Sequence, residues 1–301
     1  MKKHSFLQVD VFTDKPFEGN QLAVFPDGRG LTAKTMQAIA KEMAFAESTF
    51  ILPAEKKGDV RMRIFTPDSE LPMAGHPTIG STFALAHLGR IKRGRPQFVF
   101  ELGVGPTPVA LEWNRSGLSF AWMTQRAPEF GRSPADMRDL AAALGLTVDD
   151  LADGPPPQEA SCGVPFFFVR LASRRAVDAV EVDRRALERF YGAHGLKTLP
   201  VFAFTTERGS DKATCYSRMF APGLGIVEDP ATGGASGPLG SYLVHHGVVT
   251  PEQGARILSL QGKKMGRPSW IHVDIGTSDG AINRVRVGGK AVMIGEGHLR
   301  F

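Results

Sequence analysis

Two stretches of this chain decide its fold: RIFTPDSELPMAGHPTIGSTFALAHLG at 63–89 and RMFAPGLGIVEDPATGGASGPLGSYLVHHG at 218–247. Both contain an Arg-x-Phe-x-Pro opening, a Glu-x-Pro turn, a glycine, and an apolar run that ends in Leu-x-His-x-Gly. The second copy differs in spacing only by three extra residues in its loop. Self-similarity of this kind indicates a duplicated half.

Each copy predicts a strand, a turn rich in Gly and Pro, and the start of an apolar helix. The first N–H groups of a helix have no partner within the helix, and the helix dipole favours negative charge there. We therefore expect two helix N-termini that face across a pseudo-twofold axis and line a cleft for an anionic ligand.

The rest of the chain consists mainly of strand-like segments, with a breakdown of periodicity at 126–136 that predicts a linker between two halves. Expected strands lie at 5–13, 21–25, 48–52, 60–65, 97–102, 107–113, 117–123, 165–171 and 201–206, with three more after 269. Expected helices lie at 32–45, 136–144, 183–191 and 251–260, the last with a capping box at its start. Strands grouped around one long apolar helix in each half predict an α+β fold.

Composition excludes several classes of protein. Hydrophobic residues make up 42% of the 301 residues, and the chain contains no apolar run of about 20 residues, so we expect no membrane span. The N-terminus lacks the apolar core of a signal peptide, which predicts a cytoplasmic protein. The net charge is +5, but the basic residues are scattered, so we expect no nucleic-acid partner. Cys162 and Cys215 lie in no ligand-like spacing, so we expect no metal site.

Glu47 is the candidate catalytic base. It follows a predicted helix and precedes a predicted strand, among neighbours that are nearly all apolar or small. A carboxylate in such surroundings has little water to ionise into, and its pKa is expected to rise toward the range of an acid–base catalyst. The alternative is a glutamate that satisfies a nearby backbone N–H or points into water.

His76 and Asp229 occupy the turns before the two apolar helices. A histidine there can change charge near neutral pH, although it can also be a structural turn residue. Asp229 can act on a ligand or simply cap the helix that follows. A duplicated fold with a polar, titratable residue on each turn predicts a site built from both.

The chain resembles the PhzF-like isomerases of phenazine biosynthesis, which belong to the diaminopimelate epimerase-like fold. The resemblance is carried by VDVFTDKPFEGNQLAVF (9–25), AFAESTFIL (44–52), FTPDSELPMAGHPTIGS (65–81), FAPGLGIVEDPATGGASGPL (220–239), QGKKMGRPSWI (261–271) and VGGKAVMIGEG (287–297). It implies two hot-dog-like halves, each a curved, mostly antiparallel sheet around a central helix. The first half is expected at 1–127, completed by the strand 288–301, and the second at 128–287. The resemblance also implies an active site between the halves, a homodimer and no cofactor.

The resemblance assigns roles to residues. It makes Glu47 the group that moves a proton within a small carboxylate like trans-2,3-dihydro-3-hydroxyanthranilate, with His76 and Asp229 lining the site. Five residues are expected to hold the substrate: Asn20, Gly75, Thr232, Gly233 and Gly234. The family commonly has serine where this chain has Gly234, which removes a hydroxyl near the substrate.

Two other functions are compatible with the sequence. One is an epimerase or racemase of an amino-acid-like substrate that uses a second base other than a thiol, because neither repeated turn carries cysteine. The other is a binding protein for small carboxylates that has the cleft without the proton transfer.

Overall fold

Each repeated stretch folds into a strand, a short antiparallel partner and a buried helix, and the two copies lie in different units of the chain. The computed structural model describes residues 2–134 and 137–301. One unit contains Met1–Thr124 with Arg286–Phe301, and the other contains Gln125–Val285. The expected divisions, after 127 and before 288, lie within three residues of these bounds.

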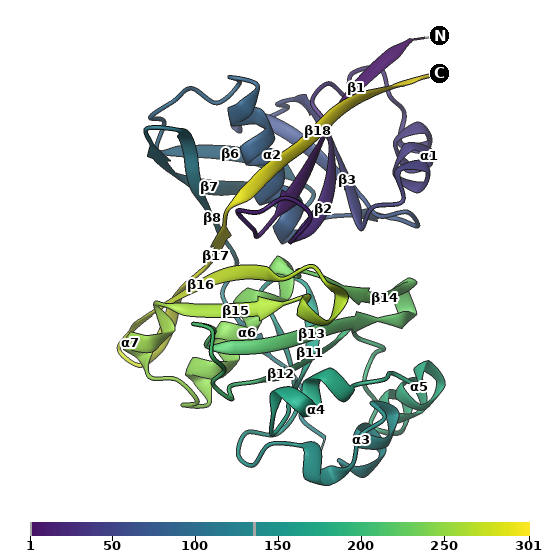
Figure 1. Cartoon of the computed structure of the whole chain (residues 1–301), viewed down its shortest axis with the longest axis vertical. Helices are drawn as coiled ribbons and strands as arrows, with labels where there is room; N and C mark the ends of the chain where they lie inside the picture. The colour runs from purple at the N-terminus through teal and green to yellow at the C-terminus, as the bar shows by residue number, and fades with distance from the viewer. Residues whose placement is uncertain (1, 135–136) are drawn as a thin grey trace. The chain divides into compact units, whose positions relative to one another are not determined.

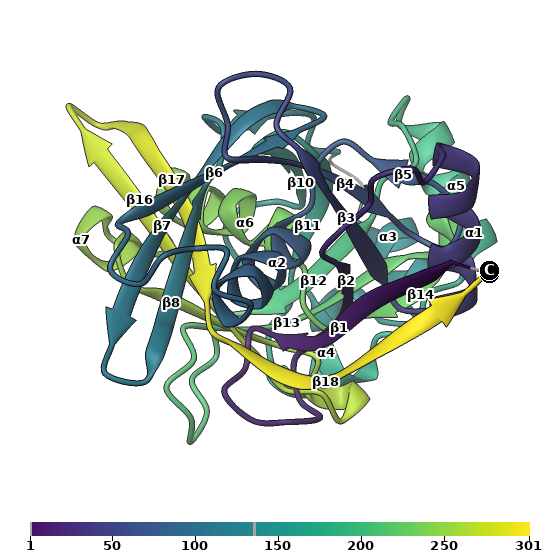
Figure 2. The same ribbon diagram turned by 90° about the horizontal axis from the view of Figure 1, so that it is seen from above.

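The first unit is a curved sheet with two helices. Its strands pair in the order β18–β1–β2–β3–β4–β6–β7–β8–β17, and β5 adds to β4. The strands are β1 (Lys3–Val11), β2 (Asn20–Phe25), β3 (Glu47–Pro53), β4 (Val60–Phe65), β5 (Glu70–Leu71), β6 (Gln97–Leu102), β7 (Gly105–Asn114), β8 (Gly117–Thr124), β17 (Ala281–Gly289) and β18 (Ala291–Arg300). Strand β17 enters this unit only from Arg286, where its pairing with β8 begins. The helices are α1 (Ala33–Met43) and α2 (Gly75–His87). Figures 1 and 2 show α2 enclosed by the strands of this sheet.

The second unit repeats this plan. Its strands pair in the order β9–β10–β11–β12–β13–β15–β16, with β14 added to β13. The strands are β9 (Glu129–Phe130), β10 (Gln158–Ser161), β11 (Pro165–Arg170), β12 (Val201–Thr205), β13 (Cys215–Ala221), β14 (Ile226–Asp229), β15 (Ile257–Gln261) and β16 (Ser269–Ser278). The helices are α3 (Arg138–Ala143), α4 (Arg174–Ala179), α5 (Arg184–Ala193), α6 (Gly233–His245) and α7 (Pro251–Gly254), with 3-10 turns η1 (Val148–Asp150), η2 (Pro222–Leu224) and η3 (Lys263–Met265).

Strand direction confirms the duplication. In the first unit β2 and β3 are parallel, β4 is antiparallel to β3, and β4 carries short antiparallel β5 on one stretch and parallel β6 on another. In the second unit β11, β12, β13, β14 and β15 repeat these relations in the same order. The predicted α+β class, with a mostly antiparallel sheet around a central helix in each half, is therefore confirmed.

The two central helices are buried on nearly all sides. Both α2 and α6 are 13 residues long, and both have buried residues along most of their length. A helix that is apolar all round is stable only inside a core, which the curled sheet supplies. Among the described residues, no helix has the length and hydropathy needed to cross a membrane.

Strand β11 explains why the second unit carries extra helices. Its run PFFFVR alternates between two apolar clusters: Phe166 and Phe168 face the cluster of α6, while Phe167 and Val169 face the cluster of α3, α4 and α5. A strand that is buried on both faces typically has a continuous run of apolar residues in its sequence. The helices α3 to α5 therefore cover the face of the sheet opposite α6.

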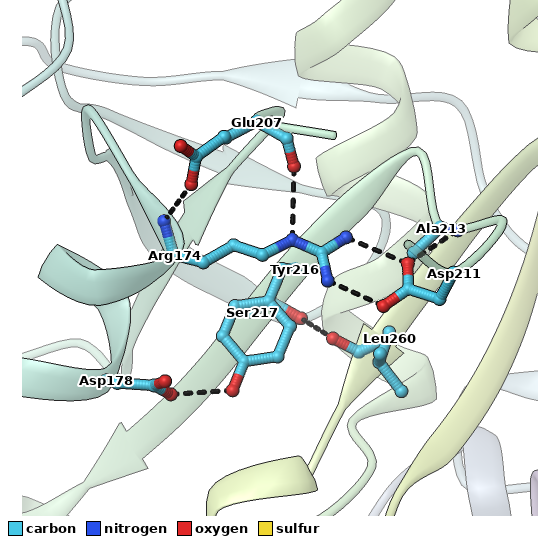
Figure 3. Close-up of polar contacts among 8 residues, drawn as sticks. All are labelled: Arg174, Asp178, Glu207, Asp211, Ala213, Tyr216, Ser217 and Leu260. Atoms are coloured by element: carbon cyan, nitrogen blue, oxygen red, sulfur yellow. Dashed lines mark hydrogen bonds and ion pairs between the residues drawn. The ribbon is translucent and has the colours of Figure 1, made fainter. Parts of the chain in front are cut away.

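A polar cluster fixes α4 to β13 and to the connection that precedes it. The guanidinium of Arg174 donates to both carboxylate oxygens of Asp211 at 2.6 and 2.8 Å, and its Nε donates to the carbonyl of Glu207. Nearby, the hydroxyl of Tyr216 donates to Asp178 at 2.6 Å (Figure 3). Both ends of this short helix are thus tied to the β12–β13 connection and to β13.

Two expected helices differ from the structure. The helix expected at 251–260 is wrong beyond its first turn: Thr250 and Gln253 form the capping box, but α7 ends at Gly254 and β15 begins at Ile257. Pairing of β15 with β13 and β16 outweighs the local helical pattern, because it buries the apolar side chains of the segment. The helix expected at 136–144 is observed as α3 from Arg138, and residues 135–136 lie outside the described chain.

Candidate active site

Three polar residues of the first unit meet where two parallel strands begin. Glu47 is the first residue of β3 and lies three residues after Ala44, the left-handed C-cap of α1. Asn20 is the first residue of the neighbouring strand β2, and β2 and β3 pair from Leu22 and Glu47 onward. His76 is the second residue of α2. The ends of three elements thus bring these side chains together.

The histidine lies between the other two side chains. His76 Nε2 is 3.3 Å from Glu47 Oε2, and His76 Nδ1 is 3.3 Å from the amide nitrogen of Asn20. The side chain of His76 is 4% exposed and that of Glu47 is 13% exposed. The amide nitrogen of Asn20 can only donate, so in this arrangement Nδ1 accepts and Nε2 carries the ring proton.

Burial keeps the imidazole neutral. It lowers the pKa of His76 to about 3, because the charged ring would lose its hydration, and a hydrogen bond with the backbone of Gln21 opposes this only in part. The sequence allowed a histidine that switches charge near neutrality, and the structure contradicts that reading. At physiological pH the ring is therefore uncharged, and its Nε2 lies 3.3 Å from a carboxylate oxygen.

The first turn of α2 lies beside this group. The helix begins at Gly75 after the N-cap residue Ala74, whose methyl side chain cannot accept a hydrogen bond from the first turn. The hydroxyl of Thr78 donates to the carbonyl of Ala74 at 2.7 Å, and no side chain of the N-cap residue accepts from the N–H groups of the turn. Such a turn suits a carboxylate.

The predicted residues of the second unit gather at the start of α6. Thr232 is the N-cap of the helix, and its hydroxyl donates to Asp229 at 2.5 Å instead of capping the first turn. Asp229 is 7% exposed. Gly233 begins the helix, and its carbonyl accepts from the amide of Gln125 at 2.9 Å.

Gly234 leaves space for a side chain at the start of α6. A Cβ atom at this position would meet only the ring of Phe166, at 3.8 Å, which is an ordinary van der Waals contact. The backbone therefore does not require glycine here. The missing side chain widens the surroundings of the first turn of α6.

Gln261 is a residue of this site that sequence reasoning missed. Its fully buried amide donates to the carbonyl of Asp229 at 2.7 Å and to the hydroxyl of Thr232 at 3.0 Å, and its oxygen accepts from the Thr232 N–H at 3.1 Å. The residue lies in the stretch 261–271 that carries the family resemblance, but its spacing from Asp229 gave no signal. It fixes the turn on which Asp229 lies.

The site residues thus form two groups. Asn20, Glu47, Gly75 and His76 are neighbours in the first unit, and Asp229, Thr232, Gly233 and Gly234 are neighbours in the second. Across residues 2–134 and 137–301, no three His, Cys, Asp or Glu side chains gather as a metal ion would require.

The cysteines are unsuited to thiolate chemistry. Cys162 and Cys215 are both buried, and burial raises the pKa of each thiol to about 12. A thiol with such a pKa is protonated at neutral pH and is a poor base.

Comparison with known proteins identifies the family. A family model described as phenazine biosynthesis-like protein matches residues 9–297. A trans-2,3-dihydro-3-hydroxyanthranilate isomerase of Pseudomonas chlororaphis is 36% identical over 98% of this chain and 99% of its own length. An uncharacterized isomerase of Mesorhizobium japonicum is 34% identical over 99% of both chains.

A solved structure agrees with these relatives. The phenazine biosynthesis protein of the PhzF family from Bacillus anthracis superposes with a TM-score of 0.89 at 26% identity and covers all of both chains. Family model, relatives and structure all span nearly the full length of the chain. The chain therefore belongs to the phenazine biosynthesis-like (PhzC–PhzF) family and is an isomerase.

Proposed function

We propose that this isomerase moves a proton between two carbons of a small carboxylate that resembles trans-2,3-dihydro-3-hydroxyanthranilate, with Glu47 as general acid and base. The observation that carries the proposal is the carboxylate of Glu47 held 3.3 Å from the buried, neutral imidazole of His76. The substrate class comes from the relative whose name states that activity.

In the proposed reaction Glu47 alone removes the proton and returns it. The carboxylate of Glu47 takes a proton from a carbon next to a conjugated system, and the electron pair of that C–H bond shifts the double bond. The carboxylic acid of Glu47 then returns the proton to the far carbon of the conjugated system. Because one base serves both steps, the proton leaves and arrives on the same face, and no oxidant or reductant is needed.

Neighbouring side chains support this step. The neutral ring of His76 lies 3.3 Å from the carboxylate and places no positive charge beside it. We assign Asp229 to the charge that develops on the ring or amino substituent of the substrate, a role for groups fixed in advance by the fold. The hydroxyl of Thr232 donates to the carboxylate of Asp229, and the amide of Gln261 donates to its backbone carbonyl. These two hydrogen bonds fix the turn that carries Asp229.

Substrate binding is assigned to the helix starts and to Asn20. Backbone N–H groups at Gly75 in α2, and at Gly233 and Gly234 in α6, are suited to carboxylate oxygens, and each helix end favours an anion by about 0.3–1 kcal/mol. Thr232 and Asn20 supply side-chain groups beside them. By the same family resemblance we propose a homodimer.

Solvent exchange tests the proposal. The enzyme is incubated with trans-2,3-dihydro-3-hydroxyanthranilate in D₂O, and the product is analysed by NMR. We expect deuterium at a new carbon with a shifted double bond, and a loss of about 10²–10⁴ in rate for Glu47→Gln. Glu42→Gln, an exposed glutamate on α1, is the matched control and should leave the rate unchanged.

The outcomes separate the alternatives. Deuterium with inverted configuration and no double-bond shift would indicate an epimerase. Tight binding without any exchange would indicate a binding protein. Full activity in Glu47→Gln would show that another group is the base.

A further inference from the structure

The buried side chain of Arg218 connects two parts of the second unit. It lies on β13 and is 7% exposed. Its Nε and Nη2 each donate to one carboxylate oxygen of Glu228 at 2.9 Å, and Glu228 directly precedes Asp229. Its Nη1 donates to three backbone carbonyls instead. These are the carbonyls of Val177, Asp178 and Val180, at 3.1, 3.1 and 3.0 Å.

The three carbonyls lie at the C-terminal end of α4. Carbonyls at the end of a helix lack the regular intrahelical hydrogen bond and carry the negative end of the helix dipole. The guanidinium of Arg218 supplies both the N–H donors and the positive charge that this end favours. The hydroxyl of Tyr216, two residues earlier on β13, donates to the side chain of Asp178 (Figure 3). The end of α4 is therefore fixed to β13 by two side chains.

The first unit contains the same arginine–glutamate pair without this support. Arg63 corresponds to Arg218 in the repeat and donates to Glu70 through the same two nitrogens. Within residues 2–134 and 137–301, Arg63 makes no hydrogen bond to a backbone carbonyl. The residue after Glu70 is Leu71, at the position that Asp229 has in the second copy. The additional hydrogen bonds thus occur in the copy whose turn carries a carboxylate.

Backbone pairing alone holds Asp229 only loosely. Asp229 is the last residue of β14, a strand of four residues, and the pairing of β14 with β13 shifts register between Met219 and Ala221. Such an irregularity locally disrupts the ladder of hydrogen bonds. Successive side chains of a strand point to opposite faces, so Glu228 faces Arg218 while Asp229 faces Thr232 at the start of α6.

We propose that Arg218 is a positioning residue for the isomerase: it links α4 to Glu228 and so fixes Asp229 where that carboxylate acts on the substrate. The inference rests on the proposed function, which assigns the developing charge to Asp229, and it gives the outer helices of the second unit a part in catalysis. Groups that stabilise a transition state must be fixed in advance by the fold. Loss of Arg218 should therefore lower kcat more than it changes KM.

A double-mutant cycle on kcat tests the proposal. The four proteins are the wild type, Arg218→Lys, Asp229→Asn and the double variant, with trans-2,3-dihydro-3-hydroxyanthranilate as substrate. Lysine keeps the positive charge but cannot donate to Glu228 and to the carbonyls of α4 in the fixed geometry of a guanidinium. We expect Arg218→Lys to lower kcat by about 10-fold and to change KM by less than about 2-fold. Asp229→Asn should lower kcat by about 100-fold.

The double variant distinguishes positioning from general stability. If Arg218 acts through Asp229, the double variant should be no slower than Asp229→Asn alone, because the group to be positioned is already lost. All rates are measured at a temperature at which circular dichroism shows every variant to be folded. Losses in kcat that multiply in the double variant would make Arg218 a structural residue and overturn the proposal.

A second variant breaks the same connection from its other end. Glu228→Gln leaves the bonds of Arg218 to α4 in place, and it should show the same loss in kcat and the same lack of a further loss with Asp229→Asn. It decides the question if Arg218→Lys does not fold. Arg95→Lys is the matched control, because Arg95 donates to both carboxylate oxygens of Asp59 in the first unit. It should leave kcat and KM unchanged.

The other outcomes separate this inference from the proposed function. Unchanged kcat in Arg218→Lys and Glu228→Gln, with a wild type that isomerises the substrate, overturns the role of Arg218 alone. Full activity in Asp229→Asn overturns the role proposed for Asp229 and this inference with it, but not the role of Glu47. A wild type that does not isomerise the substrate overturns the proposed function and the inference together.

Discussion

The chemistry that we propose for Glu47 takes place beside a histidine that burial keeps neutral. His76 lies in the first turn of α2, where its ring is buried against the starts of β2 and β3. A protonated imidazole beside Glu47 would form an ion pair and weaken the carboxylate as a base. A neutral ring adds no charge beside Glu47, which suits the proposed role of this residue in both taking and returning a proton.

We expect His76 to remain neutral throughout the working pH range. Its pKa of about 3 means that the ring signals of His76 in ¹³C-histidine-labelled protein should show no titration between pH 5 and 8. His76→Asn assigns the signal, and the exposed His87 of the same helix provides a solvent-facing comparison. A titration of the His76 signal near pH 6.5 would contradict burial as the dominant effect on its pKa.

At the scale of elements, the same ion pair ties the strand to the turn in both copies of the repeat. Arg63 donates through Nε and Nη2 to Glu70, and Arg218 donates through the same two atoms to Glu228. Each guanidinium also lies over a phenylalanine two residues later, at 5.1 Å in the first copy and 4.7 Å in the second. We call each arginine–glutamate pair, Arg63–Glu70 and Arg218–Glu228, a clamp. Each clamp holds the turn that precedes one group of site residues, and Glu228 is the immediate neighbour of Asp229.

Burial predicts that the two clamps contribute unequally to stability. The side chains of Arg218 and Glu228 are 9% and 11% exposed, whereas those of Arg63 and Glu70 are 18% and 41% exposed. Glu228→Gln should lower the free energy of unfolding by about 3 kcal/mol, because it leaves a buried guanidinium without its counter-charge. Glu70→Gln, the matched change in the other copy, should cost less than about 1 kcal/mol. Urea unfolding measures both, and equal losses would refute the argument from burial.

The sequence predicted elements well where local pattern and tertiary environment agree. The repeat correctly predicted where α2 and α6 begin. In both copies the Gly- and Pro-rich turn ends, and the apolar run begins, at the point where the helix enters the core. The helix predicted after Gly254 was wrong because the pairing of β15 with β13 and β16 determines the conformation of this segment. That pairing cannot be seen in the local sequence.

The sequence likewise predicted some features of the candidate site and missed others. Glu47, His76 and Asn20 were selected from the sequence, and the structure brings them together. The neutral state of His76 and the contacts of Gln261 depend on burial and on residues far apart in the chain. No spacing along the sequence contains that information.

At the scale of the whole molecule, burial of His76 and the ion pair of Asp211 make stability depend on pH in the same direction. The pKa of His76 is lowered to about 3, and the hydrogen-bonded guanidinium of Arg174 lowers the pKa of Asp211 to about 2. In both cases the unfolded chain binds its proton at a higher pH than the folded one. Stability is therefore complete above pH 6.5 and falls as the pH decreases.

We expect two stages in this acid destabilisation, measured by urea unfolding between pH 8 and pH 2.5. From pH 6.5 down to 3, the unfolded state protonates His76 first, so the free energy of unfolding falls by on the order of 1 kcal/mol per pH unit from this residue. Below pH 4 the loss of the Asp211 ion pair adds to it. Asp211→Asn should therefore lower stability at pH 7 by about 1 kcal/mol and flatten only the second stage. Asp153→Asn, an exposed aspartate of the same unit, should leave both stages unchanged. A profile of the wild type that stays flat down to pH 4 would refute the buried neutral state of His76 from which the first stage follows.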